Sequence, residues 1–234
     1  MKRETQHVLL LLLGGALVKI TLNGDYLRYV RPSHAWWLLT AGVVVVLLAG
    51  VGVVRDYRCA STGDTGHGGH SPWLLMLPVL AIFLVAPPAL GADAAGRSSN
   101  VNVVARQSEE FAALPDGPAP QLALTDVVAR ANWDRSGQLD GREITVTGFV
   151  VRRGASVQLA RMAIVCCAAD ARPVRLRLDG VAGPAGPLDE PADTWLEVRG
   201  TVQPGSATAA PDHVPVMTVH TARVVAPPPD PYVY

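Results

Sequence analysis

Two adjacent cysteines followed by an aspartate are the first group of residues that could do chemistry. Cys166, Cys167 and Asp170 lie within the segment MAIVCCAADARP. Thiolates and a carboxylate are good ligands for soft or borderline metals, so the group is a candidate site for a divalent metal ion. Neighbouring side chains on a regular strand point to opposite faces, so both cysteines reach one ion only where the strand ends. The alternatives are structural cysteines, one buried and one partly exposed, or a strained disulfide between them in an oxidising compartment.

A second candidate is the glycine-rich segment RDYRCASTGDTGHGGHSP. It contains His67 and His70, with Cys59 and Asp64 before them. Short tracts rich in histidine can bind metal. The alternative is a solvated loop, which we favour because glycine makes the segment costly to order.

No catalytic set stands out, so we do not expect an enzyme. The sequence has no glycine-rich phosphate loop, no nucleophile elbow with a serine and no zinc-protease motif. A thiol oxidoreductase is the enzymatic alternative, but adjacent cysteines lack the two-residue spacer of redox motifs. His213 and His220 lie near the end of the chain, and we interpret both as surface residues.

The composition divides the chain of 234 residues into two parts. Leu, Val, Ala and Gly dominate before about residue 92, and charged residues mix with short apolar runs after it. The net charge is zero and no basic face stands out, which excludes nucleic acid as the expected partner. An odd number of cysteines, three, does not suggest a disulfide framework.

The apolar part, 1–91, predicts three transmembrane helices and therefore contact with membrane lipid. The expected spans are 7–22, 35–54 and 73–90, since about 20 apolar residues cross a bilayer. Lys19, near the end of the first span, can extend to the lipid headgroups. The alternative for the first span is a signal peptide, but no small-residue cleavage site follows it. No acidic residue lies in mid-span, so transport by this chain alone is not expected.

The positive-inside rule leaves the orientation open, because either topology exposes the same number of basic residues to the cytoplasm. The segment ALGADAA, after the third span, resembles a cleavage site. On that basis we expect a multi-pass protein of the cell membrane with its C-terminal domain outside the cytoplasm.

The rest of the chain predicts a tethered, mainly β domain. Residues 92–120 form an expected linker, 121–226 the β-rich domain and 227–234 a tail. A short helix should begin near Thr125 as its N-cap. Five alternating segments then predict strands, namely REITVTGFVVRR, SVQLARMAIVC, PVRLRLDG, TWLEVRGTVQ and PVMTVHTARVV. Five short strands favour a small OB-like barrel, with a β-sandwich as the alternative.

Several phrases together resemble the YcgQ-like family of permease subunits. They are GDYLRYVRP, ITVTGFV, RMAIVCCAADARPV, TWLEVRGTV and PPDPYVY. The resemblance implies N-terminal helices, a linker and a β-rich domain, working beside a larger polytopic permease subunit. It also implies that Cys166, Cys167 and Asp170 are the positions that matter. The leading hypothesis is therefore an accessory subunit of a permease complex, and the alternative is a membrane-tethered metal-binding or sensory module without a transport partner.

Overall fold

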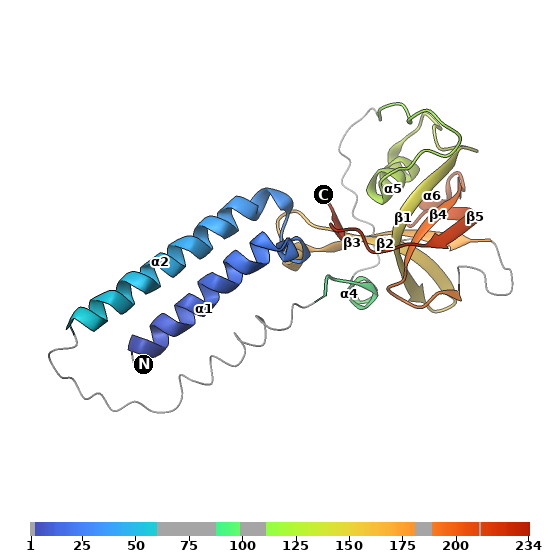
Figure 1. The fold of residues 1–234 in the computed structure, drawn as a ribbon. Helices are drawn as coiled ribbons and strands as arrows, with labels where there is room; N and C mark the ends of the chain where they lie inside the picture. The colour runs from blue at the N-terminus through green and yellow to red at the C-terminus, as the bar shows by residue number, and fades with distance from the viewer. Residues whose placement is uncertain (1–2, 60–87, 99–110, 181–188, 211) are drawn as a thin grey trace. The chain divides into compact units, whose positions relative to one another are not determined.

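A computed structural model describes residues 3–59, 88–98, 111–180, 189–210 and 212–234 (Figure 1). The chain divides into two compact units, Met1–Ala89 and Leu90–Tyr234. In the described residues the first unit is helical, and the second is built on a β-sheet (Figure 1).

The first unit is a helical hairpin. Its helices are α1 (Arg3–Leu22) and α2 (Ala35–Cys59), joined through the 3-10 helices η1 (Asp25–Arg28) and η2 (Pro32–His34). The two α-helices run side by side (Figure 1). They approach closely at Gly14 and Gly42, because a Cβ on Gly14 would lie 2.9 Å from the carbonyl oxygen of Gly42. Small residues allow such close approach of helices.

The prediction of three transmembrane helices is wrong. In the part of the chain that the structure describes, one helical stretch, Pro32–Arg58, is long and apolar enough to cross a membrane. The apolar helix Gln6–Leu22 is shorter, and a bilayer core requires about 20 residues. The third predicted span, 73–90, lies almost entirely outside the described residues.

The second unit contains one mixed sheet of six strands. They are β1 (Glu143–Arg153), β2 (Ser156–Ala163), β3 (Arg172–Asp179), β4 (Trp195–Val202), β5 (Val216–Val224) and β6 (Tyr232–Val233). The order across the sheet is β1-β4-β5-β3-β2-β6, and β1 also pairs with β2. The β3–β5 and β2–β6 pairs are parallel, and the other pairs are antiparallel. A turn with Gly154 at a φ of 57° joins β1 to β2, as a tight hairpin turn requires.

This sheet corrects the predicted five-stranded OB-like barrel. The sixth strand, β6, forms from the segment 227–234 that the sequence presents as a tail. Alternation locates long strands, but a strand of two residues after a Pro-rich stretch is too short to alternate. The sandwich alternative requires two sheets, whereas the described strands form one.

The main core lies between the sheet and α5 (Leu124–Trp133). Leu124, Val127 and Val128 of α5 are buried together with residues such as Ile144 and Leu176 of the strands. α5 begins one residue before the predicted N-cap, and its N-cap, Ala123, makes no side-chain cap. Apolar packing of one face therefore stabilises this helix. A short helix, α6 (Ser206–Ala209), lies near α5 (Figure 1).

The beginning of the predicted linker also packs on this unit. Residues Ala92–Arg97 form α4, in which Ala92 and Ala95 are buried. Nη2 of Arg175, on β3, donates to the carbonyl oxygen of Ala95 at 2.5 Å. The Arg175 side chain is itself buried, so this interaction lies inside the unit.

Candidate metal centre

The loop that carries the two cysteines joins β2 to β3. Ala163, the last residue of β2, pairs with Arg172, the first residue of β3. The intervening loop, 164–171, therefore leaves and re-enters the sheet at one place. Within it a 3-10 turn, Ala168–Asp170, brings the chain back toward the cysteines.

The carboxylate of Asp170 holds this loop together. Oδ1 accepts the backbone N–H of Val165 at 2.8 Å. Oδ2 accepts the N–H of Cys166 at 2.8 Å and of Cys167 at 3.2 Å. A hydrogen bond from the Cys166 thiol and these backbone hydrogen bonds lower the pKa of Asp170 well below its usual range. The aspartate is therefore a carboxylate at any physiological pH.

The loop brings all three predicted residues together. One ligand atom from each of Cys166, Cys167 and Asp170 lies within 4.8 Å of the others. Both cysteines are free thiols, and their sulfur atoms are 3.6 Å apart. Because β2 ends at Ala163, the strand geometry that would send the two side chains to opposite faces no longer applies. Cys166 is exposed, and Cys167 and Asp170 are half-buried.

The same carboxylate controls the thiol beside it. The hydrogen bond with Asp170, followed by that with Cys167, raises the pKa of Cys166 to about 12. A protonated thiol is a poor nucleophile. The arrangement therefore suits ligation of an ion that displaces the thiol proton better than it suits redox exchange.

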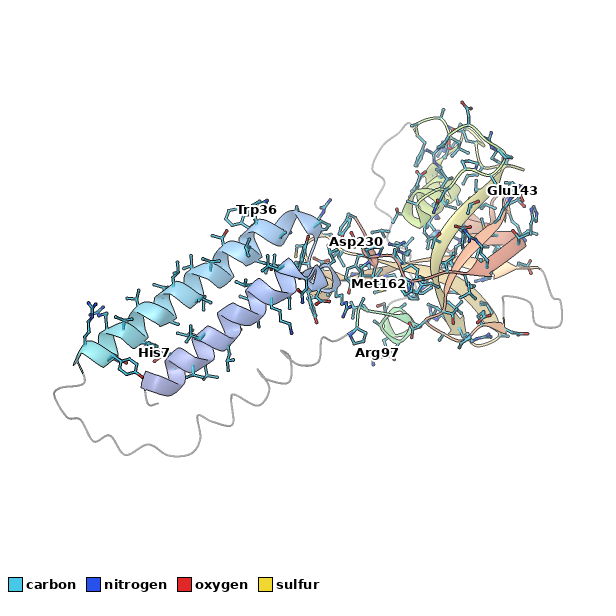
Figure 2. All side chains as sticks on the ribbon, viewed as in Figure 1. His7, Trp36, Arg97, Glu143, Met162 and Asp230 are labelled. Carbon is cyan, nitrogen blue, oxygen red and sulfur yellow. The ribbon has the colours of Figure 1, made fainter. Side chains whose placement is uncertain are left out.

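The C-terminal segment supports the strand that leads into the loop. β6 pairs with β2 through Met162 with Tyr232 and Ala163 with Val233, and the N–H of Ile164 donates to the carbonyl oxygen of Val233 at 3.0 Å. Figure 2 labels Met162 and Asp230 in this region. The C-terminal segment is therefore hydrogen-bonded to the strand end and to the first residue of the thiol loop.

Arg161 and Tyr232 fix that segment, and sequence reasoning did not identify either residue. Nη2 of Arg161 donates to the carbonyl oxygens of Asp230 at 3.1 Å and of Tyr232 at 2.9 Å. The Arg161 guanidinium also lies 5.0 Å from the centre of the Trp195 ring. Tyr232 is a buried residue, and its hydroxyl oxygen accepts the N–H of Leu90 at 3.2 Å. A Pro-rich tail with alternating tyrosines, PPDPYVY, was the available signal.

The second predicted metal site is not tested by the structure. His67, His70 and Asp64 lie outside the described residues. Cys59 is the last residue of α2.

A charged cluster on the sheet surface is a structural feature of another kind. Glu143 accepts from Arg199 at 2.5 Å and lies 2.9 Å from Nδ1 of His220. The hydrogen bond from Arg199, followed by that of His220, lowers the pKa of Glu143 to about 2. His220 is an exposed residue whose ring nitrogen lies within hydrogen-bonding distance of Glu143. The cluster links β1, β4 and β5 rather than presenting open ligand atoms.

Comparisons with known proteins give a family model that matches the C-terminal region and one distant solved structure. A crystal structure described as that of an aspartyl-tRNA synthetase from Leishmania major Friedlin aligns with a TM-score of 0.27 and 11% identity. The alignment covers 50% of this chain and 22% of that one, and at this score it carries no argument. No curated protein matches the chain. Residues 133–234, which include the thiol loop and β6, match the family model described as the DUF1980 C-terminal domain.

Proposed function

We propose that this chain is a membrane-anchored accessory subunit of a permease complex, whose β-rich domain binds a solute or metal ion through Cys166, Cys167 and Asp170. The observation that carries the proposal is the convergence of two free thiols and an ionised carboxylate on one exposed loop. Accessible thiols beside a carboxylate are suited to capturing and releasing a metal ion or solute.

The anchor is supported by the surface of α2. Trp36 and Trp37 are 78% and 75% exposed, and Leu47 and Leu48 are also largely exposed. Such large apolar side chains on a soluble surface would form an unfavourable patch. In a bilayer they would face lipid or a partner helix, with the tryptophans at the interface.

The partner is inferred from the resemblance to the YcgQ-like family, in which a larger polytopic permease works beside such a subunit. Of the glycines that could admit a partner helix, Gly14 and Gly42 face each other within the hairpin. Gly15 and Gly50 have no atom within 4 Å of an added Cβ. The latter two remain open to a helix of the permease.

Co-purification tests the complex directly. The full chain, tagged at its C-terminus and extracted in mild detergent, should bring a polytopic membrane protein at near-equal stoichiometry. A Gly15→Leu/Gly50→Leu double variant should reduce that recovery while the hairpin itself stays folded. Recovery of this chain alone at native expression level would contradict the proposal.

The localisation belongs to the same proposal. We place the chain in the cell membrane with its β-rich domain outside the cytoplasm. A C-terminal reporter enzyme that is active only outside the cytoplasm should then be active. Activity of a reporter that works only in the cytoplasm would instead show that the β-rich domain lies in the cytoplasm.

The alternative is a tethered metal-binding or sensory module without a transport partner. The cluster of Cys166, Cys167 and Asp170 supports this alternative as well as it supports a permease subunit, because all three residues lie in one chain and need no second protein. Stoichiometric ion binding by a chain that never recovers a polytopic protein would favour this alternative.

A further inference from the structure

We infer that Cys166, Cys167 and Asp170 form a three-ligand site for a tetrahedral divalent ion of the zinc class, with the fourth coordination position open to solvent or to an incoming ligand. This inference rests on the proposed role of the loop in binding and names the kind of ion.

The ligand types exclude hard cations. Ca²⁺ and Mg²⁺ require six or more oxygen ligands. The cluster offers two sulfur atoms and a carboxylate, and thiolates select soft or borderline ions.

The separation of the sulfur atoms selects the geometry. At a metal–sulfur distance of about 2.3 Å, sulfur atoms 3.6 Å apart subtend an angle of about 100° at the ion, close to the tetrahedral value. A linear arrangement with the same bond length would require about 4.6 Å between the sulfur atoms. The thiols are therefore already spaced for one tetrahedral ion, without movement of the backbone.

The hydrogen bonds of Asp170 leave one oxygen able to ligate. Oδ2 accepts two backbone N–H groups, from Cys166 and Cys167. Oδ1 accepts one backbone N–H, from Val165, and the carboxylate is relieved of the Cys166 thiol hydrogen bond once an ion displaces that proton. Carboxylates that bind metals are commonly oriented by such hydrogen bonds.

The number and exposure of the ligands predict exchange. Among the described residues the group has three members, and closed structural zinc sites have four protein ligands. Cys166 is exposed, so the open position lies at the protein surface. An ion held there can pass to a donor group of a partner.

The test uses the reduced full chain in detergent, stripped of metal and titrated with zinc. We expect one zinc ion per chain, and X-ray absorption should give two sulfur and two oxygen or nitrogen neighbours. Cys166→Ser and Cys167→Ser should each lower zinc affinity at least about 100-fold, since loss of even an outer-shell partner costs 10–100-fold. Cys59→Ser is the matched control and should bind as the wild type does.

Circular dichroism of each variant checks that the sheet is intact. Zinc bound without sulfur neighbours, with four sulfur neighbours, or with wild-type affinity in both cysteine variants would overturn the inference. In that case co-purification of the permease could still succeed, and the proposed subunit role would stand. If co-purification failed while zinc binding was normal, the subunit role would be contradicted and the zinc site would stand.

Discussion

Asp170 is the residue on which the candidate site depends. Its two oxygens accept three successive backbone N–H groups, so the aspartate shapes the loop as well as contributing a ligand. Its spacing from the cysteines is legible in the sequence, because all three residues lie in one short segment. The end of the strand before Cys166 could not be predicted, because apolar residues continue to Val165.

The thiol of Cys166 should titrate late. Beside the Asp170 carboxylate its pKa is raised to about 12, so in the metal-free protein its alkylation rate should still be rising at pH 10. Asp170→Asn removes the negative charge that disfavours the thiolate. We expect alkylation at pH 8 to become at least about 10-fold faster, with a plateau near pH 9 to 10.

Both measurements use a Cys59→Ser/Cys167→Ser background, so that Cys166 is the only thiol and the smaller effect of the Cys167 thiol on its pKa is removed from both proteins. A variant that reacts faster at every pH without a shift in the midpoint would indicate loosening of the loop alone. Equal pH profiles would show that the carboxylate does not control the thiol.

Glu143 makes a separate prediction about pH. Its pKa is about 2 in the folded chain and about 4.3 when unfolded. The hydrogen bonds that the carboxylate accepts from Arg199 and His220 therefore stabilise the fold above about pH 4.3. Their contribution is lost as the pH falls towards 2.

Thermal unfolding of a Glu143→Gln variant checks this. The variant should unfold below the wild type at pH 7, and the difference should shrink between about pH 4 and pH 2. Glu197→Gln loses one ion pair, with Arg223, and should have a smaller effect. A difference that grows as the pH falls would contradict the assignment.

Among the elements, the C-terminal strand β6 is the main feature that could not be predicted from the sequence. The five longer strands follow alternating segments and could be predicted from them. The pairing of β6 with β2 joins residues far apart in the chain, and no local pattern reports such a contact. The same holds for α4, whose alanines pack on the sheet although their surroundings read as a linker.

Removing Tyr232 should therefore loosen both the domain and its thiol loop. The side chain is 2% exposed, and truncating a buried aromatic residue costs about 3 kcal/mol or more. Tyr232→Ala should lower the midpoint of chemical denaturation accordingly and weaken zinc binding. Tyr234→Ala is the control, because Tyr234 is 43% exposed and should cost less than about 1 kcal/mol. Equal effects of the two variants would show that β6 does not support the site.

The helical hairpin makes a prediction about its glycines. A side chain at Gly14 would meet Val46 and the Gly42 carbonyl, whereas Gly15 faces open space. Gly14→Leu should destabilise the hairpin in detergent by about 1–3 kcal/mol, the usual cost of overpacking. Gly15→Leu should leave its unfolding unchanged. Equal destabilisation would mean that the helices do not pack at Gly14.

At the scale of the whole molecule, the composition divides the chain as the structure does, into an apolar helical unit and a β-rich unit. The number of transmembrane helices could not be predicted from apolar runs alone, because a helix crosses a bilayer only when it is long enough. In the described residues one helical stretch, Pro32–Arg58, is long and apolar enough. The molecule combines an apolar helix with a thiol loop in a separately packed unit. That combination is the basis for proposing an anchored binding subunit.

Metal content of the chain purified from membranes tests this account most directly. The full chain, extracted in mild detergent from zinc-supplied cells without added reductant or chelator, should contain about one zinc ion per molecule. The Cys166→Ser/Cys167→Ser variant should contain almost none, and Cys59→Ser should match the wild type. Zinc that is absent from the wild type, or equal in all three proteins, would contradict the central claim that this loop is an ion-binding site.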